Sequence, residues 1–340
     1  TLAGRALRNA QVTLAANLLN GRLRGDVTGS AELDGHRATL ITHLESDETT
    51  QALSDIGFEI AGTRISGGII RSVETGLLDG RLDVVAPDVS LAAALLLADA
   101  SGAVNAAVEF KPDNGQQGLG VTANASNFRF NDIAVGRADI SAGIADLFGV
   151  PVVDGSASAT TVRAAGVVIN TLDARANQSG DTTNFDAQAA LATGTNIDVA
   201  GALSPIADGY RLALDRANLV QGSLSARLAN PSALVVRGDS VALDAIRFDV
   251  GSGSITATGT AGTALDMVVD IANLPLSIAN AVAPDLGLAG TLNGRATVSG
   301  DASDPQVRFQ AQAGRLRSPP SALPRSAFRL MAPMPARPWF

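Results

Sequence analysis

Side chains that commonly carry chemistry are scarce in this sequence. It has no cysteine and only two histidines, His36 and His43. The absence of cysteine removes disulfides, thiolate nucleophiles and cysteine-ligated metals. The histidines are an odd number of positions apart, so on one strand they would point to opposite sides of a sheet. We therefore expect two surface histidines rather than a shared metal ion or a proton relay.

Carboxylates and glycines form no recognisable site either. The acidic cluster Glu45, Asp47 and Glu48 lacks the glycine and the final glutamate of an EF-hand loop, which predicts a solvated turn. Residues 115–120, Gly-Gln-Gln-Gly-Leu-Gly, match neither the dinucleotide fingerprint nor a phosphate-binding loop. No Gly-x-Ser-x-Gly nucleophile elbow occurs. The sequence predicts no enzyme, no metal ion and no cofactor.

The charge balance argues against nucleic acid as a partner. The 340 residues have a formal net charge of −8, and the only lysine is Lys111. A nucleic-acid binder needs a basic stripe to neutralise phosphates. We therefore expect no nucleic-acid partner.

Alternation of apolar and polar residues is the main structural signal. Leu292 and Val298 would face one way while Asn293 and Arg295 face the other, and similar patterns recur along most of the chain. Hydrophobic residues are 46% of the chain but aromatic residues only 4%, with 35 glycines. This favours many short strands with tight turns and a thin apolar layer over a deep core built around aromatic residues. A change of phase at Ala245 predicts a β-bulge there.

These patterns predict a mainly β protein. Strands with one dry and one wet face are typical of a long antiparallel sheet, and accumulated twist makes such a sheet curl. We expect an elongated, curled antiparallel β-sheet (a β-taco or groove, solenoid-like) with a few short helices. Apolar runs bounded by proline, serine or glycine predict those helices at Leu91–Ala98, Ala142–Phe148 and Ser277–Pro284.

Two segments, near 86–110 and 273–309, share one order of short pieces. In each, a proline and a serine precede an apolar run, and a Gly-x-aliphatic-Asn motif follows, at 102–105 and 290–293. The nearly equal spacing is interpreted as an internal repeat. The alternative is two ordinary helix-to-strand connections in a low-complexity sequence.

The segment 273–309 carries a family resemblance. Its Pro-Leu-Ser, short apolar run, Gly-x-Leu-Asn-Gly, Val-Ser-Gly and Asp-Pro-x-Val-x-Phe resemble the TamB branch of the AsmA-like, bridge-type lipid transport family. TamB is the inner-membrane component of the translocation and assembly module. The resemblance covers about Ala3 to Ala313 and is most specific in the two segments named above.

The resemblance implies a setting and partners. It implies a periplasmic protein of a Gram-negative bacterium, anchored in the inner membrane through a segment absent from this chain. The implied roles are phospholipid transport to the outer membrane, outer-membrane protein assembly and autotransporter secretion. The implied partners are phospholipid acyl chains and an Omp85-type (TamA-like) outer-membrane barrel, which a missing carboxyl-terminal region would contact. A chain that opens at Thr1 and has no apolar run of bilayer length fits a fragment of a longer protein.

From the residues alone, the apolar face has two interpretations. It can seal against itself, as in a structural or adhesive, passenger-like β-solenoid with a closed core. It can also stay open and shield lipid acyl chains, since each buried methylene contributes about 0.8 kcal/mol. The resemblance favours the open conduit. Its predicted lining is Leu212, Leu214, Leu224, Leu228, Val241, Leu243, Phe248, Val250, Ile255, Met267, Val269, Ile271, Leu292, Val298, Val307 and Phe309.

The last part of the chain differs from the rest. Residues 1–313 form the repetitive β-groove segment, whereas 314–340 hold 6 of the 14 prolines and the only tryptophan. We interpret this tail as disordered, or as a truncation or shifted reading frame. A Pro-rich partner motif is the alternative, but Pro320 and Pro324 lack the required P-x-x-P spacing.

Overall fold

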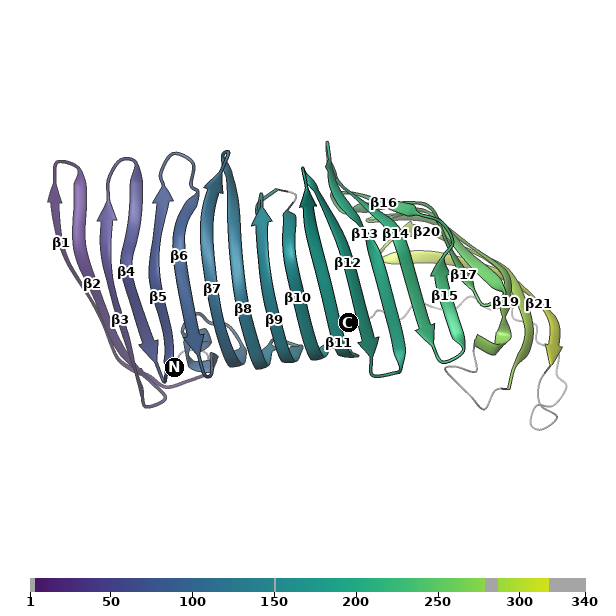
Figure 1. The fold of residues 1–340 in the computed structure, drawn as a ribbon, viewed down its shortest axis with the longest axis horizontal. Helices are drawn as coiled ribbons and strands as arrows, with labels where there is room; N and C mark the ends of the chain where they lie inside the picture. Colours follow the sequence, from purple (N-terminus) through teal and green to yellow (C-terminus); the bar gives the residue numbers. More distant parts are fainter. Residues whose placement is uncertain (1–3, 150, 279–286, 318–340) are drawn as a thin grey trace. The chain divides into compact units, whose positions relative to one another are not determined.

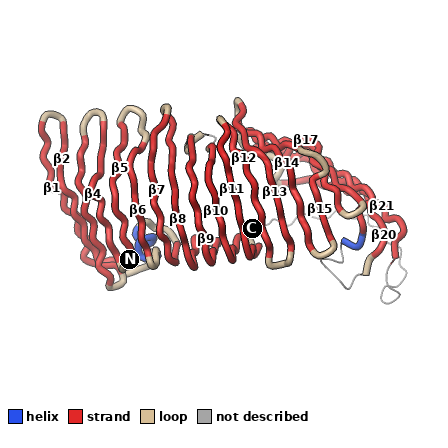
Figure 2. Tube along the Cα trace, viewed as in Figure 1, coloured by secondary structure: helices blue, strands red, loops and turns tan. Residues whose placement is uncertain are grey.

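The computed structural model describes residues 4–149, 151–278 and 287–317. These residues form 21 strands, one short α-helix and one turn of 3₁₀ helix (Figures 1 and 2). All strand pairings within each part are antiparallel, so the predicted antiparallel β class is confirmed. The chain divides into two compact units, Thr1–Ala192 and Thr193–Phe340, which are described separately.

In the first unit, strands that follow one another in the chain pair with each other, from β1 to β12 (Figure 1). The α-helix α1 (Ser90–Leu95) lies between β6 and β7 in the chain. The strands are β1 (Leu7–Leu19), β2 (Arg22–Leu33), β3 (His36–Ser46), β4 (Thr50–Ile60), β5 (Thr63–Ser72), β6 (Leu78–Ala86), β7 (Ala100–Asp113), β8 (Gln116–Phe130), β9 (Ile133–Ala145), β10 (Val152–Ala164), β11 (Val167–Ser179) and β12 (Thr182–Leu191).

Two-residue turns set the register of many of these hairpins. In five of them both turn residues have positive φ, the conformation of a type I′ turn, which matches the twist of the flanking strands. Glycine takes the second position each time because it adopts positive φ without steric cost. The turns are Asn20-Gly21, Asp34-Gly35, Ala61-Gly62, Asn114-Gly115 and Ala165-Gly166.

The second unit follows the same hairpin order with one interruption. Both β15 and β16 pair with β14 on one side and β17 on the other, so together they act as a single broken strand. The break contains Pro231, which has no N–H to donate to a ladder. The strands are β13 (Thr195–Ile206), β14 (Gly209–Gln221), β15 (Leu224–Leu228), β16 (Ser232–Arg237), β17 (Ser240–Val250), β18 (Gly253–Ala261), β19 (Ala264–Pro275), β20 (Ala289–Asp301) and β21 (Asp304–Arg317), with η1 (Leu276–Ile278) after β19.

The bulge predicted at Ala245 is confirmed. Ala245 has φ +48°, and the pairing of β17 with β18 shifts between Leu243 and Ile246. Leu243 pairs with Gly259 and Ile246 with Ala257. Because Gly259 and Ala257 are two positions apart on β18, the bulge returns Ile246 to the face that Leu243 occupies.

The helix predictions have mixed outcomes. The helix predicted at Leu91–Ala98 appears as α1, which begins one residue earlier and ends at Leu95. The helix predicted at Ala142–Phe148 is wrong, since β9 continues to Ala145 and Ala142 pairs with Val121. Small apolar residues fit the periodicity of a helix as well as that of a strand. In the structure, pairing with β8 makes this segment part of a strand. Of the helix predicted to end at Pro284, residues 279–284 lie outside the described residues.

The carboxyl-terminal boundary also differs in detail from the sequence pattern. Strand β21 continues to Arg317, four residues beyond position 313. The predicted tail from 318 to 340 lies outside the described residues. Within the part of the chain that the structure describes, no helix has the length and apolar character needed to span a bilayer.

A small core lies where α1 packs on the sheet. Ala94 of α1 forms a buried cluster with Leu33, Ala38 and Ile60 of β2, β3 and β4. Partly buried Leu91, Ala92 and Leu95 pack around it. The Asp88 carboxylate accepts hydrogen bonds from the backbone N–H groups of Ser90 and Gly102, at 2.9 and 3.1 Å, and so links the start of α1 to β7.

We predict that Ile60→Ala destabilises the protein by about 2–5 kcal/mol, because it leaves a cavity beneath α1. Ile70→Ala, a control with the same chemistry at an exposed position of β5, should change the free energy of unfolding by about 0.5 kcal/mol or less. Urea unfolding followed by circular dichroism measures both. Equal losses for the two variants would contradict a core beneath α1.

Candidate functional site

One face of the first unit carries rows of apolar side chains that cross the strands. In an antiparallel pair, directly opposed residues point to the same face. Following these partners from β1 to β12 gives a central row with no polar member. The row is Val12, Gly29, Leu40, Phe58, Ile65, Val84, Ala106, Ala123, Ile140, Ala157, Ala174 and Ala187.

Two further rows flank the central one on the same face. The first runs from β4 to β12 and the second from β1 to β10, and both contain only apolar residues and glycine. The first is Ile56, Gly67, Leu82, Val108, Val121, Ala142, Gly155, Ala176 and Phe185. The second is Ala16, Gly25, Leu44, Leu53, Ile69, Gly80, Phe110, Leu119, Ile144 and Val153. These three rows are called the first apolar face.

The side chains of the central row become smaller from the first strands of the unit to the last. On β3 to β6 its members are Leu, Phe, Ile and Val, whereas on β7 to β12 every member except Ile140 is alanine. In the neighbouring row, Gly155 has no side chain at all. Its φ is +151°, and a Cβ there would lie 2.2 Å from the Ser141 carbonyl oxygen, so the backbone requires glycine. The side chains of the central row are therefore smallest over β7 to β12.

The second unit has an equivalent surface, called the second apolar face. Its central row crosses β13, β14 and β16 to β21. The row is Leu203, Leu212, Leu234, Leu243, Gly259, Met267, Val298 and Val307. A second row on this face is Leu228, Phe248, Ile255 and Ile271.

The register brings all the predicted lining residues onto this second face. Those outside the two rows lie an even number of positions along a strand from a row member, so they point the same way. They are Leu214, Leu224, Val241, Val250, Val269, Leu292 and Phe309. Leu228 and Val250 are buried, Val307 and Phe309 on β21 are exposed, and the rest are half-buried.

Both apolar faces are only partly shielded from solvent. Among the described residues just ten hydrophobic side chains are buried, and Leu33, Ala38, Ile60, Ala93 and Ala94 belong to α1 or the strands beneath it. A face packed against a second layer would bury most of its row members. Sequence reasoning missed Leu203, Leu234 and the whole first apolar face, although the same alternation in β3 to β6 could have identified its bulky members.

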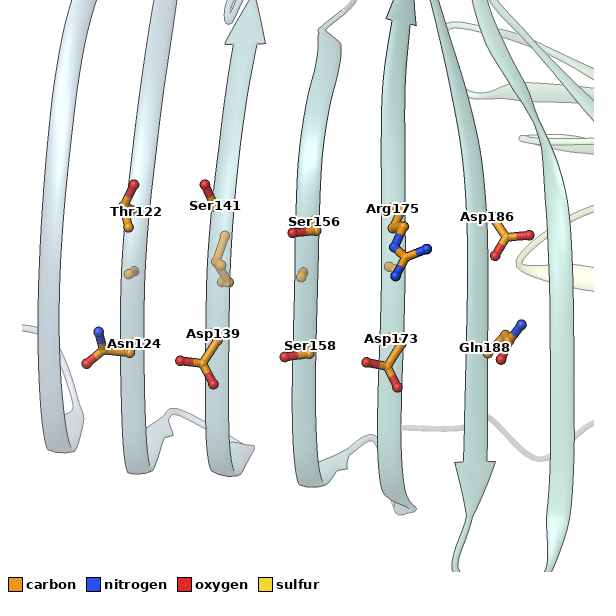
Figure 3. Close-up of a pocket in the computed structure, with 14 residues that line it drawn as sticks. Thr122, Asn124, Asp139, Ser141, Ser156, Ser158, Asp173, Arg175, Asp186 and Gln188 are labelled. Carbon is orange, nitrogen blue, oxygen red and sulfur yellow. The ribbon is translucent and has the colours of Figure 1, made fainter.

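The opposite face of the first unit is mostly polar, although Ile41, Ile70 and Val85 also lie on it. Over β8 to β12 it holds a shallow concavity of about 610 Å³, and Figure 3 displays its polar side chains in two rows across the strands. One row is Thr122, Ser141, Ser156, Arg175 and Asp186, and the other is Asn124, Asp139, Ser158, Asp173 and Gln188. The described residues contain no cluster of three metal-ligating side chains. This polar surface keeps one side of the sheet hydrated.

The two histidines lie on opposite faces, as their spacing predicts. His36 is opposite Leu33, and His43 is opposite Asp26 on the polar face. The imidazole Nδ1 of His43 lies 2.9 Å from Asp26 Oδ1, and this hydrogen bond raises the pKa of His43. The histidines therefore share no site.

The turn predicted at the acidic cluster is found after β3. Asp47 lies between β3 and β4, where its carboxylate accepts hydrogen bonds from the Thr49 and Thr50 backbone N–H groups, both at 2.9 Å. These bonds hold the pKa of Asp47 far below its usual range. Residues 115–120 form a hairpin turn and the start of β8.

We predict that the His43 titration midpoint lies above that of the same residue in an Asp26→Asn variant. The charged imidazolium gains the hydrogen bond in the folded state, so the folded pKa exceeds the unfolded one. Its stabilising effect is then present below the unfolded pKa and is lost as pH rises through the folded pKa. An NMR titration of the imidazole protons measures both midpoints, and identical values would contradict the pairing.

Neither a family model, nor a curated protein, nor a solved structure matches this chain. The function is therefore inferred from its own residues.

Proposed function

We propose that the chain is a conduit that shields phospholipid acyl chains along its two apolar faces. The observation that carries this proposal is the set of apolar rows, which are uninterrupted within each unit and mostly half-buried. Aliphatic side chains, phenylalanines, Met267 and glycines form them, and no row has a polar member. Such a surface suits a long aliphatic ligand.

Burial of a lipid tail against these rows is favourable without directional contacts. Each methylene removed from water contributes about 0.8 kcal/mol. Neighbouring strands lie about 4.8 Å apart, so one tail lying along a row contacts several strands at once. Because the row members offer similar apolar contacts, a tail can shift from strand to strand with small changes in free energy. No hydrogen bond to the lining has to break during that step.

The family resemblance in segment 273–309 supplies the wider setting of the proposal. In it, the conduit lies in the periplasm of a Gram-negative bacterium, with an inner-membrane anchor and an Omp85-type barrel partner contacted by other parts of a longer protein. Transport of phospholipids toward the outer membrane, together with outer-membrane protein assembly and autotransporter secretion, is then the proposed role. A structural β-solenoid with a closed core has less support, because its apolar interior should be buried.

A charge on the second apolar face should weaken lipid binding. Leu243→Asp places a carboxylate in the central row, and a bound tail would have to desolvate it. We expect affinity for a fluorescent fatty acid to fall about tenfold or more, a loss of about 1.4 kcal/mol or more. Ala242→Asp is the matched control, since it adds the same charge to the next residue, on the opposite face.

Fluorescence titration of the purified chain measures both affinities, and circular dichroism checks the fold. Equal affinities for the two variants would remove the main support for the conduit.

A bulky side chain in the alanine-lined part of the first apolar face should also exclude lipid. Ala157→Trp puts a bulky ring among the alanines of β10 to β12, whereas Ser156→Trp puts it on the polar face of the same strand. We expect the first variant to co-purify with less phospholipid, because the ring occupies the volume of a tail. Quantitative mass spectrometry of extracted lipids compares the two, and an unchanged lipid content in Ala157→Trp would argue against this stretch as a binding surface.

A further inference from the structure

Three exposed arginines lie close together on neighbouring strands of the first unit. They are Arg129 of β8, Arg137 of β9 and Arg163 of β10, and they are called the arginine triangle. Among the described residues, none of their guanidinium groups forms an ion pair. Each therefore keeps its charge and its five N–H donors available for a ligand.

Several arginines elsewhere on the strands are instead neutralised by a nearby carboxylate. The Arg81 guanidinium lies 2.7 Å from the Asp83 carboxylate, two positions along β6. The Arg295 guanidinium lies 3.1 Å from the carboxylate of Asp270, its opposite residue on β19. The arginine triangle lacks such partners, in a chain whose formal net charge is −8.

Arg129 and Arg163 flank one residue of the strand between them. In the pairings of β9 with β8 and with β10, both arginines are opposite Ala134. Directly opposed residues share a face, so the two side chains leave the sheet on the same side. Two strand spacings separate them, which is roughly 10 Å. An arginine side chain is long enough to span half of that separation.

A bulge in β8 brings Arg137 onto the same face. Ser126 and Arg129 are three positions apart, yet they are opposite residues only two positions apart on β7. Asn127, which has φ +49°, lies in the bulge, so Ser126 and Arg129 share a face. Arg137 is opposite Ser126, and it lies two positions from Asp139 of the polar face. All three arginines therefore belong to the polar face.

The strand between the arginines leaves room for a ligand. Arg137 lies three positions from Ala134 along β9, which is about 10 Å. Ala134 is small, and Gly136 has no side chain. Ser126 and Thr160 are opposite Arg137 on its two sides, so their hydroxyl groups add donors beside the guanidinium. The arrangement provides donors around a space that no bulky side chain of β9 fills.

Two carboxylates of β9 and its turn lie outside this space. Asp139 is beyond Arg137, on the side away from Ala134, and Asp132 lies in the turn that precedes β9. An anion between Arg137 and Ala134 is therefore closer to the three guanidinium groups than to either carboxylate. The local field at that position favours a negative charge.

We propose that the arginine triangle binds a phosphate group. A guanidinium donates two parallel hydrogen bonds to phosphate oxygens, and a phosphate group has enough oxygens to engage several guanidinium groups at once. A soluble phosphate ester and a phospholipid headgroup both present this chemistry. The site lies on the face opposite the apolar rows, so it does not depend on the binding of acyl chains.

An NMR titration of the arginine Nε–H signals with inorganic phosphate tests the site. We expect the Arg137 signal to shift, and we expect phosphate affinity to fall about tenfold or more in Arg137→Gln. The matched control is Arg81→Gln, which removes the same charge from the polar face of β6 at an arginine already paired with Asp83. It should leave the affinity unchanged. Because phosphate has no aliphatic tail, the apolar faces do not contribute to this measurement.

Equal losses in Arg137→Gln and Arg81→Gln would overturn the proposal, as would a wild-type chain whose arginine signals do not respond to phosphate. Acetate at the same ionic strength should have little effect on these signals, and an equal response to acetate would show a general effect of charge instead of a phosphate site. Arg137→Lys keeps the charge but loses the planar fork, so we expect it to bind phosphate more weakly than the wild-type chain. Circular dichroism checks the fold of each variant.

Two further probes distinguish the sources of the phosphate group. If the natural ligand is a soluble ester, glycerol 3-phosphate should shift the Arg137 signal, and phosphatidic acid should not increase co-sedimentation of the chain with phosphatidylcholine vesicles. If it is a lipid headgroup, phosphatidic acid should increase co-sedimentation, and Arg137→Gln should remove that increase. An increase that Arg137→Gln and Arg81→Gln reduce equally would contradict binding at the arginine triangle.

Discussion

Backbone hydrogen bonds between successive strands determine where the apolar side chains of this protein lie. Each tight turn fixes one hairpin register, and that register decides which residues of the next strand share a face. A slip of one residue would move a whole strand's apolar set to the opposite side. The uninterrupted rows of both apolar faces depend on this ladder, since little side-chain packing between layers holds the described residues together.

Local irregularities maintain the rows where regular alternation would break them. At Ala245 the bulge changes the phase of β17, so that Leu243 and Ile246 remain on one face. At Asn273 a positive φ coincides with the shift that brings Leu274 opposite Leu292. At Pro231 the ladder is interrupted, and β15 and β16 still occupy the place of one strand. These departures preserve the separation of apolar and polar surfaces.

Alternation in the sequence was sufficient to predict the antiparallel class and the Ala245 bulge. It could not separate helix from strand at Ala142–Phe148, where small residues fit both and the pairing of β9 with β8 is decisive. It also missed the first apolar face, because alanines such as Ala157 and Ala174 give a weak periodic signal. Their significance comes from their opposite partners on neighbouring strands, which one sequence does not reveal.

The hairpin order within each unit has a consequence for how the chain acquires its structure. Nearly every strand meets a partner that has only just preceded it in the sequence, so contact order is low along the ladder and loop closure costs little entropy. Each finished strand offers a template for the next. Within a unit, ordering can therefore advance from one end as the polypeptide emerges, without waiting for distant segments to arrive.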